Sequence, residues 1–486
     1  MPAAAILSVC CTAQFMVVLD VSVVDVALPD MRHSLGLSVT GQQWVVNAYT
    51  LTFAGFLMLG GRAADLFGRR RVFMTGLLVF TLASLVGGLA RNGEWLVGAR
   101  AVQGVGGAIL APTSLSLLTT SFPERHRRMR ALRVWSATAS SAAAVGVVAG
   151  GLLTHFLDWR WVLFINMPIG SALLWAAWSL LDESRTGGPR RTLDIAGAFT
   201  VTGGLAVVVF GIVSTATHPW GSPRTLLTLT SGVVLLATFV VIEARIASDP
   251  IVPLATFRRR SVSIANAVAI AVGCALFGMY FFLSLFLQQI NGYSALAGGL
   301  AFLPSGLASL TTSLCLNRLP RFLRPRRQLV LGPVITAGSL FWLAALAPGD
   351  AYLANVFGPL VLFGLGLGLT FVPMTAAATD AMPAHQAGLA SALVNTSRQV
   401  GGAVGLAVMA TVAAAAANTA VPTAGGRANG LAAGYDHAFA IPAVALLVAA
   451  GLALFLPTAP RVPATEQTPV TTVRGLEGED VVRLRA

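Results

Sequence analysis

Two aspartates, Asp20 and Asp25, lie inside an apolar segment that is long enough to cross a membrane. The segment runs from about residue 6 to residue 28, and these are the only charged side chains in it. A carboxylate near the centre of a bilayer costs about 2.5–3.5 kcal/mol on insertion scales, so such a residue usually has a function. The chemistry that suits it best is the binding and release of a proton.

Arg100 is the expected partner of these aspartates. It lies five residues inside an apolar segment, 95–118, that runs in the opposite direction to the first. A helical rise of 1.5 Å per residue then places Arg100 at a depth between Asp20 and Asp25. A lone buried arginine is as costly as a lone buried aspartate, so a pair is the cheaper arrangement. We predict a proton site at Asp20 or Asp25 beside Arg100; the alternative is a static ion pair with a structural role.

The composition identifies the elements that must position this site. The chain has 486 residues, of which 56% are hydrophobic and only 10% are charged, whereas soluble domains average about 25% charged residues. The fold class is therefore an all-α polytopic membrane protein. The formal net charge of +13 does not indicate nucleic-acid binding, because the arginines lie in short loops between apolar segments.

Apolar windows of about 20 residues predict the transmembrane helices. There are fourteen of them: 6–28, 43–61, 72–91, 95–118, 131–154, 161–181, 193–214, 225–246, 262–287, 294–316, 328–347, 353–376, 387–414 and 437–457. Arginines concentrate in every second loop, which predicts that both termini are cytoplasmic. The absence of lysine, with heavy use of alanine, glycine and arginine, suggests a GC-rich bacterial genome and hence a bacterial cytoplasmic membrane.

The chain also shows signs of an internal repeat. The loop GRAADLFGRRRVF from Gly61 is echoed by RLPRFLRPRRQLV from Arg318, and repeated halves around a central site are a common transporter architecture. The polar end of the chain has the composition of a disordered cytoplasmic tail. The predicted domains are a six-helix bundle at 1–182, two inserted helices at 183–256, a second six-helix bundle at 257–457 and a tail at 458–486.

The loop that begins at Gly61 has a specific pattern. Gly61 allows close helix packing, Asp65 can cap or pair, and Gly68 permits the turn into Arg69 and Arg70. The string resembles the loop between the second and third helices of the major facilitator superfamily. This resemblance implies that Asp65 meets the start of the thirteenth helix and holds a cytoplasmic gate shut. A basic loop that only sets topology would not need Asp65 or the two glycines.

Several other strings are similar to the fourteen-helix drug:proton antiporter branch of that superfamily. They are LVGARAVQGVGGA from Leu96, QQWVVNAYTL from Gln42, DWRWVLFINMPIG from Asp158, LDIAG from Leu193, FLQQINGYSALAGGLAFLP from Phe286 and GLASALVNTSRQVGGAVG from Gly388. Together they cover nearly the whole chain. We assign five residues in them to the substrate pathway or to the interface between the two halves: Trp44, Asn47, Gln103, Arg398 and Gln399.

Arg398 lies near the middle of its segment, and no acidic residue of the last six segments has a similar depth. It is therefore expected to face water, backbone carbonyls or a carboxylate of another helix, with a purely structural role as the alternative.

The fifth segment departs from the branch. Its antiporter motif normally has Gly-Pro before the final Gly-Gly, but here the string is AVGVVAGG, with Val147 in place of the proline. Gly146, Gly150 and Gly151 remain, and small residues four apart favour helix packing. A helix without the proline should be straighter. The departure keeps open a second function, a lipid or glycolipid translocase without strict proton coupling.

The expected function is a proton-coupled efflux transporter that works by alternating access on a hydrophobic or amphipathic small molecule. Export follows from the resemblance. We expect a monomer in the lipid bilayer, driven by the proton gradient, with no cofactor, metal or nucleic-acid partner. The histidines lack ligand spacing, and no cluster of His, Asp, Glu or Ser at one membrane face indicates an enzyme.

Overall fold

The computed structural model describes residues 3–122, 124–183, 194–215, 218–247, 250–316, 325–382, 387–419 and 426–457. Within these ranges the regular structure is helical, without strands. The first part of the chain forms α1 (Ala3–Leu35), α2 (Val39–Phe67), α3 (Arg69–Gly88), α4 (Gly93–Ser121), α5 (Arg125–Phe156), α6 (Trp161–Phe164) and α7 (Asn166–Leu180).

The remaining described residues also form helices. The inserted part contains α8 (Ile195–Ser214), α9 (Pro223–Val241), the π-helix η1 (Ile242–Ile246) and the 3₁₀-helix η2 (Leu254–Arg258). The last part contains α10 (Arg260–Leu285), η3 (Phe286–Ile290), α11 (Ala295–Ala301), α12 (Leu303–Cys315), α13 (Pro325–Leu343), η5 (Tyr352–Val356), α14 (Phe357–Thr379), α15 (Ala387–Thr419) and α16 (Gly426–Ala453).

Twelve helices of the described chain are long and apolar enough to cross a membrane. The other two predicted segments are also helical. One is α5, which includes a shorter apolar stretch, Val145–Phe156, and the other is α13, which has 19 residues and begins with Pro325, Arg326 and Arg327. The multi-pass helical prediction is confirmed, and the number of fourteen crossings stays a prediction.

Two predicted segments are each divided into two helices. Segment 161–181 becomes α6 and α7, and segment 294–316 becomes α11 and α12. Pro168 and Pro304 lie in the first turn of the second helix of each pair. Proline fits the first turn of a helix but cannot donate a hydrogen bond to the preceding turn, so both breaks occur just before a proline.

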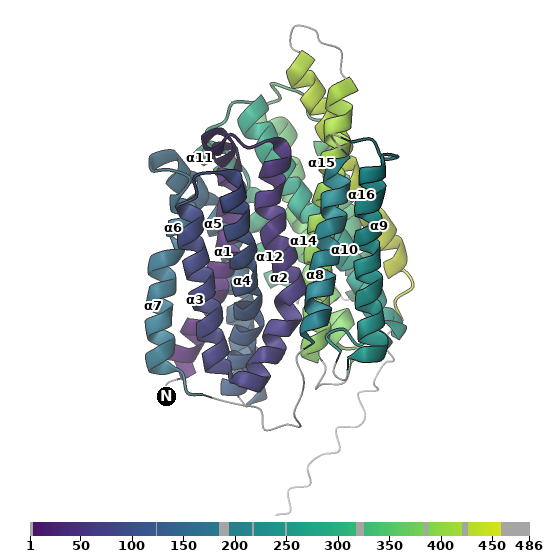
Figure 1. Cartoon of the computed structure of the whole chain (residues 1–486). Coiled ribbons are helices and arrows are strands. Elements are labelled where there is room, and N and C mark those ends of the chain that lie inside the picture. The colour runs from purple at the N-terminus through teal and green to yellow at the C-terminus, as the bar shows by residue number, and fades with distance from the viewer. Residues whose placement is uncertain are drawn as a thin grey trace, which may run out of the picture. The chain divides into compact units, whose positions relative to one another are not determined.

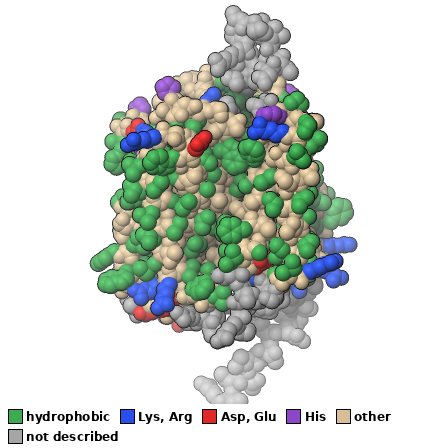
Figure 2. Space-filling model, viewed as in Figure 1, with side chains coloured by type: hydrophobic (Ala, Val, Ile, Leu, Met, Phe, Trp, Pro, Cys, Tyr) green, Lys and Arg blue, Asp and Glu red, His purple; other side chains and the backbone are tan. Residues whose placement is uncertain are grey.

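The helices run alternately between two ends, which we name after the glycines that turn the chain there. Gly36 lies between α1 and α2 with a φ of 62°, and Gly68 lies between α2 and α3 with a φ of 100°. Both values favour glycine. The Gly68 end is the one predicted to be cytoplasmic. Figure 2 shows charged side chains gathered near the two ends, with a largely uncharged band of hydrophobic residues between them.

The first and last parts of the chain meet along two seams. At one seam α2 contacts α15, and at the other α5 contacts α11 and α12. The helix α8 packs against both α2 and α15, while α9 packs on α8 (Figure 1). Leu51 of α2, Val209 of α8 and Ala403 of α15 belong to one buried apolar cluster. The inserted hairpin therefore covers the α2–α15 seam.

Two side-chain hydrogen bonds between α1 and the last part of the chain lie toward the Gly36 end. Gln288 of η3 donates a hydrogen bond from Nε2 to the backbone oxygen of Val26, at 3.2 Å. Arg32 donates from Nη1 to Oε1 of Gln289, at 3.4 Å. The buried apolar cluster at this end also includes residues of both parts, such as Val24 and Phe281.

Candidate functional site

Asp20 lies on α1 and is completely buried. Close packing of α5 helps to hold α1 in this position. A Cβ atom on Gly146 would lie 2.8 Å from Cβ of Ser22, and one on Gly150 would lie 2.9 Å from the backbone oxygen of Val23. These distances are shorter than van der Waals contact, so glycine is required for the two helices to approach this closely.

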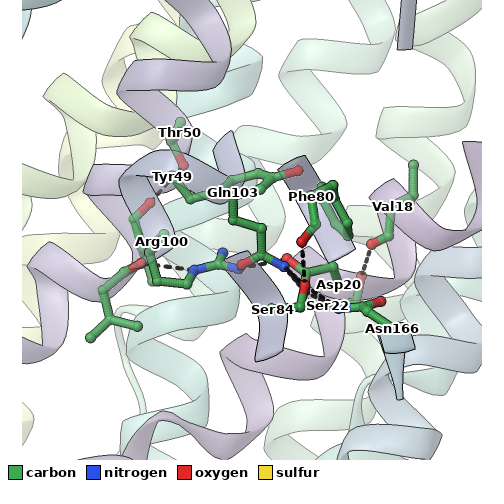
Figure 3. Close-up of polar contacts among 12 residues, drawn as sticks. Val18, Asp20, Ser22, Tyr49, Thr50, Phe80, Ser84, Arg100, Gln103 and Asn166 are labelled. Atoms are coloured by element: carbon green, nitrogen blue, oxygen red, sulfur yellow. Dashed lines mark hydrogen bonds and ion pairs between the residues drawn. The ribbon is translucent and has the colours of Figure 1, made fainter. Parts of the chain in front are cut away.

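The Asp20 carboxylate accepts three hydrogen bonds from side chains of other helices (Figure 3). Its Oδ2 is 2.5 Å from Nη1 of Arg100 in a buried ion pair. Its Oδ1 accepts from Nε2 of Gln103 at 2.7 Å and from Nδ2 of Asn166 at 2.8 Å. The predicted pairing of Arg100 with a helix-1 aspartate is present, and it involves Asp20.

The Arg100 guanidinium has further partners. Its Nη1 also donates to Oε1 of Gln103 at 2.7 Å, and its Nε donates to the backbone oxygen of Val45 at 3.3 Å. The guanidinium lies over the ring of Tyr49, 4.3 Å from the centroid. A cation over an aromatic face gains electrostatic stabilisation in a desolvated site. The side chain of Arg100 is 2% exposed, so these contacts replace nearly all of its water.

Ser84 of α3 joins the two amides of this network. Its Oγ accepts from Nε2 of Gln103 at 2.7 Å and from Nδ2 of Asn166 at 3.3 Å, and it donates to the backbone oxygen of Phe80 at 2.9 Å. The network thus connects α1, α2, α3, α4 and α7. We call the side chains of Asp20, Ser84, Arg100, Gln103 and Asn166 the Asp20 network.

Three members of this site were not singled out from the sequence. Ser84, Tyr49 and Asn166 are uncharged. An uncharged residue in a membrane segment is less costly than a charged one, so it indicates a functional site less strongly. Two signals pointed toward them. Tyr49 lies in the string QQWVVNAYTL and Asn166 in the string DWRWVLFINMPIG, and both strings carry the family resemblance.

Asp25 has a different environment. Its side chain is only partly buried, and it makes no hydrogen bond or ion pair with any residue that the structure describes. It interacts electrostatically with Asp20, Arg100 and the hydroxyl group of Tyr280 on α10. Asp25 is therefore a carboxylate without a direct partner, between the Asp20 network and the second bundle.

Arg398 on α15 contacts an amide and an aromatic ring. Its Nη2 donates to Oδ1 of Asn395 at 2.6 Å, and its guanidinium lies 5.5 Å from the ring centroid of Phe371 on α14. Its Nε is buried without a hydrogen bond, and no ion pair to it occurs among the described residues. Its hydrogen-bond partner within the described chain is thus the amide of a residue one helical turn away, and the expected contact with water, backbone carbonyls or a carboxylate of another helix stays a prediction.

The other proposed pathway residues are placed as follows. The Trp44 ring lies 6.3 Å from that of Phe210 on α8, so Trp44 packs against the inserted hairpin. Asn47 is completely buried, and its side-chain amide has no hydrogen bond within the described chain. Gln399 is buried. Gln103 belongs to the Asp20 network.

The turn at the Gly68 end contacts α7. Arg70 donates from Nη2 to the backbone oxygen of Trp178 at 2.6 Å, and Nε of Arg71 lies 3.5 Å from Oε2 of Glu183. Arg69 is buried. These contacts tie the turn to its own half of the molecule.

The remaining residues of the predicted gate are less fully described. Gly61 faces α4, where an added Cβ would lie 3.4 Å from Cβ of Pro112. The side chain of Asp65, and those at the start of α15 that it is predicted to meet, lie outside the described residues. The gate contact therefore stays a prediction.

Gly151 belongs to the seam between the halves. A Cβ atom added to Gly151 would lie 2.8 Å from Cα of Leu296 on α11. A Cβ atom added to Gly299 of α11 would lie 2.7 Å from the backbone oxygen of Val147 on α5. The glycines of α5 thus contact α1 on one side and α11 on the other.

Comparison with known proteins identifies the family. A sequence model of the Major Facilitator Superfamily matches residues 10–406. The cephamycin export protein CmcT of Amycolatopsis lactamdurans is 43% identical over 403 residues, which cover 82% of each chain. The puromycin resistance protein pur8 of Streptomyces alboniger is 42% identical and covers 81% of this chain and 78% of its own. The tetracenomycin C resistance and export protein of Streptomyces glaucescens is 32% identical, with 80% and 72% covered.

Solved structures show the same fold. The human organic anion transporter MFSD10 aligns with a TM-score of 0.60 at 15% identity, covering 93% of this chain and 100% of its own. A peptide transporter POT aligns with a TM-score of 0.66 at 16% identity, covering 92% and 93%. With a family match along most of the sequence, close relatives that export antibiotics or resist them, and this helical fold, the chain belongs to the Major Facilitator Superfamily.

Proposed function

We propose that this protein is a proton-coupled exporter of a hydrophobic or amphipathic small molecule of the antibiotic type. Relatives that are named for antibiotic export or resistance support the substrate class. The observation that supports proton coupling is the Asp20 network, in which a buried carboxylate accepts three hydrogen bonds from side chains of other helices. The proposal places the protein in the bacterial cytoplasmic membrane as a monomer with both termini inside.

The chemistry of protonation follows from this arrangement. All three partners of Asp20 donate, so a proton that binds to a carboxylate oxygen needs a new acceptor. The Oδ1 atom of Asn166 is buried without a hydrogen bond. A rotation of the Asn166 amide would present this oxygen to the new O–H group. Asp20 would then be neutral and Arg100 would lose its counter-charge.

Asp25 is a second carboxylate with which the positive charge of Arg100 could pair. Protonation of Asp20 changes the net charge of the Asp20–Arg100 pair from zero to +1, and an isolated positive charge is costly in a membrane interior. Asp25 makes no hydrogen bond or ion pair within the described part of the chain, and it already interacts electrostatically with Arg100. A shift of Arg100 toward Asp25 would move α4 relative to α1. We propose that this shift connects proton binding to alternating access.

The contacts between halves support a cycle of this kind. Those of α1 lie toward the Gly36 end, predicted to be external. A transporter closed at that end would expose its central site toward the cytoplasm, where export begins. Release of these contacts and closure at the Gly68 end would give the opposite state.

The test is a toxin-susceptibility panel in an efflux-deficient bacterium that expresses the wild type or Asp20→Asn at equal membrane levels. We expect the wild type to protect against at least one amphipathic antibiotic and Asp20→Asn to lose that protection. Asp158→Asn, which changes a carboxylate outside the Asp20 network, is the matched control and should protect like the wild type. Equal protection by Asp20→Asn would assign Asp20 a structural role.

Energy coupling is tested separately with everted membrane vesicles. Addition of the antibiotic identified by the panel should release protons from the vesicle lumen, detected with a pH-sensitive dye, and an uncoupler should stop transport. Uptake that continues unchanged without a proton gradient would contradict antiport and favour the alternative, a lipid or glycolipid translocase of the same fold.

A further inference from the structure

A pair of buried carboxyl groups lies at the Gly68 end of the inserted hairpin, away from the Asp20 network. Asp194 directly precedes α8, and Glu243 lies in η1, directly after α9. Their side chains are 9% and 5% exposed, and the two carboxyl groups interact with each other.

Both residues also accept hydrogen bonds from the backbone. Glu243 accepts from the amide of Ile251 on Oε1, at 3.2 Å, and from the amide of Val252 on Oε2, at 3.0 Å. Asp194 caps α8, because its Oδ1 accepts from the amide of Gly197 at 2.7 Å. The second oxygen of Asp194, Oδ2, is buried and has no donor in the described chain.

Neither carboxyl group forms an ion pair with a residue that the structure describes. Arg62 of α2 lies nearby but donates from Nη2 to the backbone oxygen of Pro250, at 3.2 Å. Arg245, on η1 itself, is exposed. The helix α8 carries no ionisable residue, and the only one on α9 is Arg224, at the opposite end of that helix. Two ionised carboxylates in contact would repel each other without compensation.

A single proton would give the buried Oδ2 atom a hydrogen bond and would also reduce the repulsion between the two carboxyl groups. Placed on Oδ2 of Asp194, it gives that orphan atom a hydrogen bond to donate and removes one of the two negative charges. Glu243 remains a carboxylate, as its two backbone donors require. We propose that the Asp194–Glu243 pair is a proton-binding site, and that its proton holds residues 250–252 against the inserted hairpin. This proposal does not rest on drug export or on proton coupling at Asp20.

The position of the pair gives the proton a structural consequence. Residues 250–252 follow the hairpin and precede the second bundle, and Glu243 accepts from both of their backbone N–H groups, because Pro250 has none. Arg62 connects the same residues to α2, directly after Gly61. Loss of the proton would make Asp194 and Glu243 repel each other, which would release residues 250–252 from Glu243 and loosen this connection.

The experiment uses the full-length protein in lipid nanodiscs and has two readouts. Infrared spectroscopy detects the C=O band of a protonated carboxylic acid, and hydrogen exchange with mass spectrometry follows the peptide that covers residues 250–252. We compare the wild type with Asp194→Asn and Glu243→Gln. Glu124→Gln, which changes a carboxylate that is exposed and paired with Arg127, is the control.

At neutral pH, we expect the wild-type spectrum minus that of Asp194→Asn to contain one carboxylic-acid band, and the same for Glu243→Gln. Protection of residues 250–252, corrected for intrinsic exchange, should fall in the wild type as the pH rises. In Asp194→Asn the protection should no longer depend on pH, because asparagine donates a permanent hydrogen bond and still caps α8. Glu124→Gln should match the wild type in both readouts.

Identical carboxylic-acid bands in the wild type and Asp194→Asn would overturn the proposal, since the pair would then hold no proton. Wild-type protection that does not change with pH would overturn its second half. If Glu243→Gln fails to fold, Asp194→Asn still decides both points. Neither outcome depends on whether the protein exports a drug.

Discussion

The two halves of the molecule treat their central charges in different ways. In the first half, Arg100 is paired with Asp20 and has further partners in Gln103, Val45 and the Tyr49 ring. In the second half, Arg398 contacts one amide oxygen and one aromatic face, and its Nε has no hydrogen-bond partner among the residues that the structure describes. A charge that is satisfied on all sides helps to fix the fold, whereas a charge with few partners can accept a new one. The difference predicts that loss of Arg100 destabilises the protein more than loss of Arg398 does.

The largest expected effect comes from removing the cation of the first half. Arg100→Met leaves the Asp20 carboxylate buried without its ion-pair partner, and breaking a buried pair in this way costs about 3–5 kcal/mol. We expect a large fall in the unfolding temperature of the purified protein and loss of export. The double variant Asp20→Leu/Arg100→Met should recover much of the stability but none of the export. A stable Arg100→Met single variant would contradict the view that the pair holds the first bundle together.

A smaller loss is expected when an uncharged member of the same network is removed. Asn166→Leu deletes a hydrogen bond to an ionised group, which is worth about 1.5–3 kcal/mol. It also removes the oxygen that is proposed to accept the proton of Asp20. Proton release on addition of substrate should therefore be largely lost, whereas the unfolding temperature should fall only moderately. Asn166→Asp keeps an acceptor oxygen, and if it couples no better than Asn166→Leu, the proposed role of the Asn166 oxygen is wrong.

The close packing beneath the network predicts an effect of similar or smaller size. In Gly146→Ala the new methyl group would lie 2.8 Å from Ser22, and overpacking of this kind typically costs about 1–3 kcal/mol. The matched control is Gly98→Ala on α4, where no atom lies within 4 Å. Thermal unfolding should separate the two variants, and equal unfolding temperatures would show that α1 and α5 can move apart without cost.

The smallest change in stability is expected from the cation of the second half. Arg398→Met leaves no carboxylate unpaired, so we expect its free energy of unfolding to change by less than about 1 kcal/mol. Export should nevertheless be impaired or altered in its range of compounds. A loss of stability as large as that of Arg100→Met would remove the contrast between the halves.

The sequence predicts the centre of the site better than its surroundings. The pairing of Asp20 with Arg100 could be predicted because buried charges are costly and the helical rise fixes their depth. Ser84 and Asn166 could not, since an uncharged polar residue in an apolar helix has many possible partners. Their contribution depends on which faces α3 and α7 turn toward α1, and this is set by packing across the whole bundle.

The same limit applies to the fold. The predicted segments coincide with helices of the described chain, while fourteen membrane crossings stay a prediction. Apolar length did not locate the interruptions before Pro168 and Pro304, which depend on local backbone geometry. The contacts of Arg70 with α7 and of Arg71 with Glu183 were not predicted, because a basic loop has no partner that its own sequence specifies. Asp194 and Glu243 were missed for a related reason. They lie at helix ends, where a carboxylate usually needs no explanation.

The position of the inserted hairpin has a consequence for how a molecule dissolved in the lipid could reach the centre. At the α2–α15 seam, α8 adds a second wall between the bilayer and the interior. At the other seam, α5 meets α11 directly, through glycines. Lateral entry from the membrane is therefore expected on the α5–α11 flank, and the extra helices would make access to this transporter one-sided.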